Sequence, residues 1–150
     1  MTATLLAGLQ ERASVAAFAH IFPPERFPFP RDAVHERWAQ AIEDPAAHVL
    51  VAERAEEAVG VALARPEWLE GLYVAPEWWG KGVADERHDR ALEVVRELGS
   101  AQIHLWVLEE NARARRFYER RGWRLRSGRS RHGASPSGWG QTELSSHLPV

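Results

Sequence analysis

Hydrophobic residues in the first part of the chain recur at the spacing of a helix. Within residues 4–19 the apolar positions that repeat in this way are Leu5, Leu9, Val15, Phe18 and Ala19. Their period predicts an amphipathic helix with one apolar face. Four prolines among the thirteen residues 20–32 then exclude both a helix and a central strand, so we expect an ordered loop there.

A second helix is expected directly after this loop. Asp32 precedes residues 33–44, and an aspartate at that position can cap a helix by accepting a backbone N–H group of the first turn. Val34, Trp38 and Ile42 then fall on one side of the helix. This spacing gives the second helix an apolar side, as in the first.

The pattern changes to alternation in the middle of the chain. Residues 48–55 and 58–65 are rich in β-forming residues and are separated by a short turn, which predicts an antiparallel hairpin. A third strand is expected at 69–75. Pro76 follows it and cannot continue a central ladder.

Helices and strands alternate in the rest of the sequence. The predicted elements are a helix from Gly82 to Leu98 that ends at Gly99, a strand at 101–108, a helix at 112–122 closed by Gly122, and strands at 123–127 and 140–148. The unit from 69 to 108 is expected to be a right-handed parallel crossover, and the other neighbouring strands to be antiparallel. We therefore predict an α/β fold in one domain, residues 1–150: a mixed, mostly antiparallel twisted sheet with helices on both faces and one central parallel β-α-β unit.

Composition narrows the classes of protein. The 150 residues are 45% hydrophobic, which suits one globular domain with a core. A net charge of −2 favours neither nucleic acid nor an anionic membrane as the main partner. The chain has no cysteine, which excludes a disulfide framework and a thiolate nucleophile. No apolar run approaches the roughly 18 residues of a membrane span, and the start lacks the features of a secretion signal, so we expect a cytoplasmic protein.

The stretch "GKGVAD" at 80–85 lies between the third strand and the following helix. Gly80 and Gly82 leave the backbone bare where a helix N-terminus presents unpaired N–H groups and partial positive charge, and Lys81 adds a cation. These features suit a pyrophosphate, with a tight turn that holds no ligand as the alternative. The dinucleotide pattern fails at Asp85, and the phosphate-loop pattern fails because Lys81 is not followed by Ser or Thr.

A second group of polar residues lies on the last predicted helix. Asn111 is a good cap for this helix, and Tyr118 lies seven residues further along on the same face. If the strand at 101–108 is parallel to the strand at 69–75, both side chains lie near the glycine stretch, at the edge where such sheets bind ligands.

Together the two segments resemble the GCN5-related N-acetyltransferase (GNAT) family. In that family a strand of the form L-Y-V-x-P leads to R/Q-x-x-G-x-G/A, and a later segment reads N-x-x-A-x-x-F-Y-x-x-x-G-F/W. The residues that match the first motif are Leu72, Tyr73, Val74, Pro76, Gly82 and Ala84. Those that match the second are Asn111, Ala114, Phe117, Tyr118, Gly122 and Trp123. The resemblance covers nearly the whole chain.

The chain departs from the family pattern at three places. Trp79 stands where Arg or Gln opens the first motif. Arg87 and His88 stand where the family has an apolar pair, so either the helix is less buried there or one of them reaches the cofactor phosphates. The strand with which the family normally begins is expected to be absent or very short.

The resemblance implies acetyl-CoA as co-substrate, no metal, and direct attack of a primary amine on the thioester. It assigns the pantetheine arm to backbone groups of Leu72, Tyr73 and Val74. It assigns the pyrophosphate, mainly through backbone N–H groups, to Trp79, Gly80, Lys81, Gly82, Val83, Ala84 and Asp85. Tyr118 is then the acid that protonates the CoA thiolate, with an aromatic packing residue whose hydroxyl is satisfied as the alternative. Asn111 combines a helix cap with a contact to the pantetheine.

The general base stays open. Alternation puts Glu70 on the same face as Leu72 and Val74, and from there it can deprotonate the amine, directly or through water. An exposed Glu70 or one paired with an arginine is the alternative. The other candidates are His104, Glu109, Glu110 and bulk water.

The resemblance places the acceptor pocket between the proline-rich loop and the last hairpin. The aromatic residues expected to wall it, or only to anchor the loops, are Phe22, Phe27, Phe29 and Trp139. An amino acid, another small amine, an antibiotic and a protein terminus all stay open as acceptor. Dimers are common in the family, which makes a homodimer an expected assembly. The alternative function is a non-catalytic acyl-CoA-binding or regulatory module on the same fold.

Overall fold

The computed structural model describes residues 1–20, 23, 25–26, 28–131 and 141–148. Its elements in chain order are α1 (Ala3–Phe18), α2 (Arg31–Glu43), β1 (His48–Arg54), β2 (Glu57–Arg65), β3 (Trp68–Val74), the short 3-10 helix η1 (Pro76–Trp78), α3 (Val83–Glu97), β4 (Gln102–Leu108), α4 (Ala112–Glu119), β5 (Arg124–Arg131) and β6 (Gln141–His147). The predicted element order is confirmed, with small shifts at the ends. Within the described residues, no strand precedes α1.

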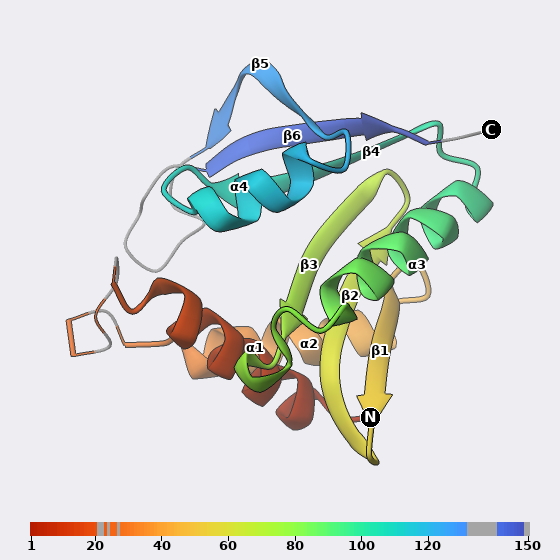
Figure 1. Ribbon diagram of the computed structural model, residues 1–150. Coiled ribbons are helices and arrows are strands. Elements are labelled where there is room, and N and C mark those ends of the chain that lie inside the picture. The colour runs from red at the N-terminus through yellow and green to blue at the C-terminus, as the bar shows by residue number, and fades with distance from the viewer. Residues whose placement is uncertain (21–22, 24, 27, 132–140, 149–150) are drawn as a thin grey trace.

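The strands form one sheet in the order β1-β2-β3-β4-β6-β5. All neighbours are antiparallel except β3 and β4, which are parallel as predicted. These two strands pair only through Trp68 and His104, where the His104 N–H also donates to the Glu67 carbonyl at 2.8 Å. Beyond this point β3 and β4 diverge toward their carboxyl ends (Figure 1). The divergence leaves an opening in the middle of the sheet.

Helices cover both faces of the sheet, which confirms the predicted fold class. Leu6 and Leu9 of α1 and Trp38 of α2 pack against one face, where the Trp38 indole N–H donates to Gln10 Oε1 at 2.8 Å. On the opposite face α3 and α4 form a cluster with β4 through Ala91, Tyr118 and related residues. Figure 1 shows α1 and α2 on one side of β3 and α3 on the other.

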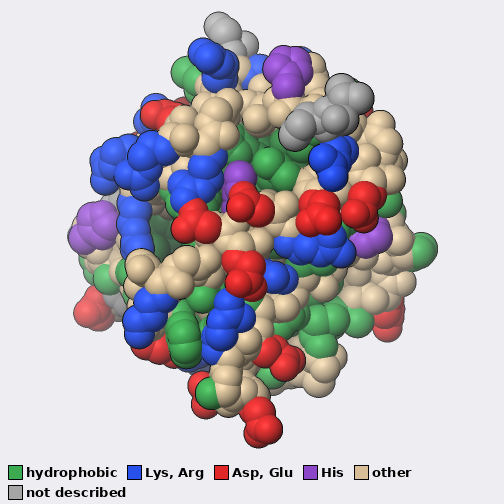
Figure 2. All heavy atoms as spheres, turned by 45° about the vertical axis from the view of Figure 1, so that its right-hand side comes forward, with side chains coloured by type: hydrophobic (Ala, Val, Ile, Leu, Met, Phe, Trp, Pro, Cys, Tyr) green, Lys and Arg blue, Asp and Glu red, His purple; other side chains and the backbone are tan. Residues whose placement is uncertain are grey.

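The outer side of α3 is charged and solvated. Arg90 lies 3.4 Å from Glu93 and 4.0 Å from Glu97. Figure 2 shows acidic and basic side chains next to one another on the face of the molecule that includes this helix. Pairs of this kind contribute little each to stability, because water screens them. The inward stripe, which includes Ala91 and Val95, holds α3 on the sheet.

Two expectations about α2 are wrong. The helix begins at Arg31 with Pro30 at its N-cap, and no side chain caps it, so Asp32 lies inside the first turn. There its carboxylate faces the positive end of the helix dipole. Ile42 is 38% exposed, whereas Ala41 is 1% exposed and packs on the sheet. At 100° per residue, position 41 returns to the direction of Val34, while position 42 rotates away from it.

Candidate active site

A cavity of about 950 Å³ lies at the opening between β3 and β4. Its walls come from α1 and α2 on one face of the sheet and from α4 on the other, so the cavity passes through the gap between the strands. The predicted site residues that line it are Glu70, Leu72, Tyr73, Val74, Trp79, Ala84, Asn111 and Tyr118. The structure therefore brings both sequence motifs to one cavity. Gly80, Lys81, Gly82, Val83 and Asp85 lie in the same turn, between the lining residues or next to them.

The glycine turn has the geometry of an anion site. Gly80 and Gly82 have φ of 75° and 87°, in the left-handed region that favours glycine. Apart from the glycine itself and its two chain neighbours, no described heavy atom lies within 4 Å of the place that a Cβ would take at either position. No described residue accepts a hydrogen bond from the N–H groups of residues 80–85. These donors are open at the N-terminus of α3, where the helix dipole favours a negative ligand.

Buried contacts fix the turn on the sheet. Val83 is 1% exposed and packs with Val59 and Val74. Gly60 of β2 permits this contact, because a Cβ there would lie 2.7 Å from Val83 Cγ1. Lys81 does not reach into the cavity lining, and its ammonium lies 5.1 Å from the centroid of the Trp78 ring. The backbone, and not the lysine, is thus the main feature of the turn.

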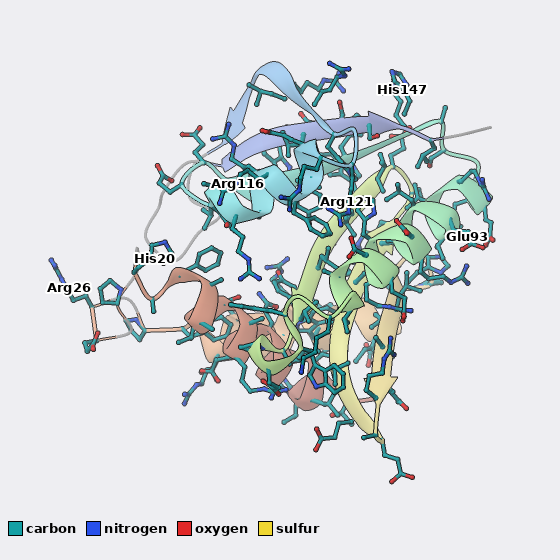
Figure 3. All side chains as sticks on the ribbon, viewed as in Figure 1. His20, Arg26, Glu93, Arg116, Arg121 and His147 are labelled. Carbon is teal, nitrogen blue, oxygen red and sulfur yellow. The ribbon has the colours of Figure 1, made fainter. Side chains whose placement is uncertain are left out.

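Asp85 connects α3 to the end of α4. Its carboxylate forms an ion pair with Arg121, whose guanidinium also donates to the Phe117 carbonyl at 2.9 Å. Figure 3 shows Arg121 between the two helices, whereas Arg116 lies on α4. The Asp85 carboxylate is occupied by this ion pair. What Asp85 offers to a ligand at the turn is its backbone N–H, which no described residue accepts.

Trp79 lines the cavity and contacts two elements of its wall, β3 and α4. Its indole N–H donates to the Val74 carbonyl at 2.8 Å, and the guanidinium carbon of Arg113 lies 4.0 Å from its ring centroid. The first contact joins the turn to the end of β3, and the second joins it to α4. The aromatic residue at this position thus has a structural function that the sequence did not reveal.

Asn111 and Tyr118 line the wall of the cavity that α4 forms. Asn111 Oδ1 accepts the Ala114 N–H at 3.1 Å, which confirms the predicted cap. The Tyr118 ring packs against Trp123 at 5.5 Å, and burial raises the pKa of its phenol above the usual value. No described residue accepts from its hydroxyl or donates to it, and Tyr118 lines the cavity. The phenol is therefore a buried neutral donor in the wall of the cavity, without a hydrogen-bond partner among the described residues.

The expectation for Arg87 and His88 is corrected. His88 is 2% exposed, so the inward side of α3 is buried there, and His88 Nε2 accepts the Trp123 indole N–H at 2.9 Å. Arg87 donates to the Val51 carbonyl at 3.3 Å and to Glu86 at 3.0 Å. Both side chains are engaged away from the glycine turn. A histidine can replace an apolar residue in this stripe because Trp123 satisfies its ring nitrogen.

Glu70 lies on a different face from the one predicted. Leu63 pairs with Gly71 and Ala64 pairs with Leu69, so Glu70 is the extra residue of a β-bulge. The bulge breaks the alternation: Leu72 and Val74 pack on the α3 side, whereas Glu70 lies among residues of the α1 and α2 side. Its carboxylate is 3.0 Å from Arg65 Nε, and Arg65 also pairs with Asp44.

The other base candidates lie outside the cavity lining. His104 is 8% exposed, with Nδ1 3.3 Å from Glu143 Oε1 and its ring 5.3 Å from that of Trp68. Glu109 and Glu110 are exposed at the end of β4. Of the candidates named from the sequence, only Glu70 lines the cavity.

The cavity also has walls that were not predicted. Phe29 lines it as expected, while Phe22, Phe27 and Trp139 lie outside the described residues. The additional lining residues include Phe18, Arg37, Trp68 and Trp106. The rings of Trp68 and Trp106 are stacked, 6.3 Å apart and 14° from parallel. The sequence held one indication for Arg37: it lies between Val34 and Trp38, two residues of the apolar stripe of α2 that packs on the sheet.

Two absences concern the described part of the chain only. None of its helices is both long enough and apolar enough to span a membrane. Nor does it contain a group of three or more His, Cys, Asp or Glu side chains placed to hold a metal ion.

Comparisons with known proteins agree with this geometry. The profile of the acetyltransferase (GNAT) family matches residues 15–123. An uncharacterized N-acetyltransferase of Archaeoglobus fulgidus is 36% identical over 81 residues, which are 47% of this chain and 55% of that protein. One from Mycobacterium tuberculosis is 29% identical over 99 residues, 63% of this chain and 64% of that protein. The chain thus spans less than two thirds of these relatives.

The fold also matches solved structures. The PaiA N-acetyltransferase from Thermoplasma acidophilum, crystallised with coenzyme A, superposes with a TM-score of 0.75 at 15% identity. The match covers 97% of this chain and 92% of that one. At this identity the likeness establishes the architecture.

Proposed function

The chain belongs to the acetyltransferase (GNAT) family, and from this premise we propose that it transfers an acetyl group from acetyl-CoA to a primary amine. The observation that carries the proposal is the cavity through the sheet, which is lined by Trp79 and Ala84, on either side of the glycine turn, and by Tyr118. Acetyl-CoA supplies a thioester whose carbonyl carbon an amine can attack directly. No enzyme nucleophile is required, and the chain has no cysteine.

The cofactor fits the residues present. The open N–H groups of residues 80–85 are donors for a pyrophosphate. Beyond Trp68, the edge of β3 that faces β4 has no described partner strand, so Leu72, Tyr73 and Val74 offer backbone groups there to the amides of a pantetheine arm. Asn111, on the facing wall, adds a side-chain amide. The PaiA N-acetyltransferase, which has the same architecture, was crystallised with coenzyme A, and this supports coenzyme A as the ligand class.

Two side chains would transfer protons in this reaction, Glu70 as the base and Tyr118 as the acid. The ammonium loses two protons when the nitrogen–carbon bond forms and the carbon–sulfur bond breaks. One passes through Glu70 to solvent, and Arg65 holds that carboxylate in place at 3.0 Å. The other ends on the sulfur, with Tyr118 as the donor that is then reprotonated. A phenol whose pKa is raised by burial stays protonated at neutral pH, as a donor must.

The test is calorimetric titration with acetyl-CoA, with NADH and ATP as controls, followed by measurement of free CoA release with a panel of amines. Selective binding and amine-dependent CoA release are expected. Binding without release under any acceptor would favour the alternative, a non-catalytic acyl-CoA-binding module. No binding at millimolar cofactor would refute the proposal. A homodimer and a cytoplasmic location stay predictions.

A further inference from the structure

A smaller cavity of about 100 Å³ shares several lining residues with the part of the large cavity that faces α1 and α2. The residues that line both are Gln10, Arg37, Glu70, Gly71 and Tyr73. This group, which we call the polar neck, contains one cation and one carboxylate. It lies on the face of the sheet opposite α3, away from the glycine turn.

The two charges of the polar neck differ in how they are compensated. The Glu70 carboxylate is paired with Arg65 at 3.0 Å, and Arg65 is paired in turn with Asp44. Arg37 has no hydrogen bond or ion pair with any described residue. The neck therefore presents an arginine fork whose donors are open to a ligand.

The Tyr73 hydroxyl lies within the influence of both groups. Burial raises its pKa, the positive charge of Arg37 opposes that rise, and the negative charge of Glu70 adds to it. Arg37, Glu70 and Tyr73 all line both cavities. Among the described contacts, Arg37 and Glu70 form no ion pair within 4.0 Å, so the Arg37 charge is not compensated by the one carboxylate of the neck.

We propose that Arg37 binds the carboxylate of the acceptor, so that the acceptor is an amino acid with an apolar side chain. The carboxylate would form the bidentate pair that the guanidinium geometry favours, and the ammonium would face Glu70. The stacked rings of Trp68 and Trp106 and the ring of Phe29 supply an apolar wall. This inference rests on the proposed acetyl transfer.

The same charges disfavour a polyamine acceptor. A chain of ammonium groups needs several free carboxylates, whereas the described lining has one, and an arginine already pairs with it. Arg37, the one cation of the neck, also repels such a chain. An acceptor with one ammonium and one carboxylate matches the polar neck in sign and in number.

The experiment compares two acceptors that differ in the carboxylate, L-phenylalanine and 2-phenylethylamine. Acetyl-CoA-dependent CoA release is measured for the wild type, for Arg37→Gln and for Arg37→Lys. Arg96→Gln, an exposed arginine at the end of α3, is the control for charge. Binding of N-acetyl-L-phenylalanine in the presence of CoA is measured by calorimetry for each. Arg37 is exposed, so its variants are expected to fold, and thermal unfolding checks this.

We expect the wild type to favour L-phenylalanine in kcat/KM by about tenfold or more, the value of a charge-assisted hydrogen bond. Arg37→Gln abolishes the preference, Arg37→Lys retains part of it, and Arg96→Gln keeps it whole. Equal rates for the two acceptors in the wild type, or a preference that survives Arg37→Gln, would overturn the inference. If neither acceptor releases CoA, acetyl transfer to these amines fails. Calorimetry then decides, because binding of N-acetyl-L-phenylalanine that is absent or independent of Arg37 also overturns the inference.

Discussion

The indole N–H of Trp79 donates a 2.8 Å hydrogen bond to the carbonyl of Val74, at the end of the strand that borders the cavity. The guanidinium carbon of Arg113 lies 4.0 Å from the centroid of the same ring. One aromatic side chain thus ties the glycine turn to β3 and to α4. The position belongs to a motif whose backbone binds phosphate in the family, and here its side chain fixes the backbone.

Replacing this indole should weaken cofactor binding. Trp79→Phe keeps a ring for Arg113 but removes the donor to Val74, so the turn loses one constraint. A hydrogen bond of this kind contributes about 1 kcal/mol, so we expect the Kd for acetyl-CoA to rise roughly fivefold. Calorimetric titration measures it. Trp78→Phe, outside the cavity lining, is the control, and an equal loss in both variants would contradict this explanation.

Gly82 provides a sharper test of the glycine turn. Gly82→Ala forces a side chain into the left-handed region at φ 87°, which costs about 1–2 kcal/mol of stability, and adds a methyl group where the ligand is expected. Gly99→Ala is a matched control, because Gly99 has φ 93° and lies at the other end of α3. Both variants should unfold at similarly lower temperatures.

Only Gly82→Ala should also lose affinity for acetyl-CoA. We expect its Kd to rise about tenfold or more beyond that of Gly99→Ala, because the methyl group blocks the approach of a phosphate to the open N–H groups. Thermal unfolding and titration of the two proteins provide the comparison. Equal Kd values in the folded variants would show that the turn is not the anion site.

Tyr118→Phe separates binding from chemistry. No described residue bonds to the hydroxyl, so its removal should leave folding and the Kd for acetyl-CoA almost unchanged. Turnover should fall by about 10²-fold or more, in the range typical of a positioned acid. Steady-state CoA release measures this effect. Turnover within about twofold of the wild type would exclude Tyr118 as the acid, whereas weakened binding would point to a packing role.

The local part of this site could be predicted from the sequence. The positive φ of Gly80 and Gly82 and the Asn111 cap depend on residue type and immediate neighbours, and the structure has both. The parallel pairing of the two central strands followed from the helix between them. These features need no knowledge of distant partners.

Features that depend on distant partners were missed. The bulge at Glu70 arises from the register between β2 and β3, and a shift of one residue changes the face of a side chain. His88 could be buried because Trp123, 35 residues later, donates to its ring. Arg37 and Trp68 line the cavity because α2 and β3 meet there, which composition and spacing do not specify.

The raised pKa of Tyr118 also leads to a prediction for the free energy of unfolding in alkaline solution. Burial raises its folded pKa above the unfolded value near 10, so its contribution to stability is complete below pH 10 and is lost as the pH rises above it. Above pH 10 the unfolded chain releases the phenol proton and the folded chain keeps it, so the free energy of unfolding falls with a slope of about 1.4 kcal/mol per pH unit.

Other groups titrate in the same range, among them Tyr73, whose pKa burial also raises. The difference between the wild type and Tyr118→Phe isolates the single phenol. Denaturant unfolding at pH 9, 10 and 11 should give a difference that is constant up to pH 10 and then shifts against the wild type. Parallel curves through pH 11 would mean that the hydroxyl ionises as freely in the folded protein as in the unfolded chain. In that case Tyr118 would not be the enclosed neutral donor that the proposed proton transfer requires.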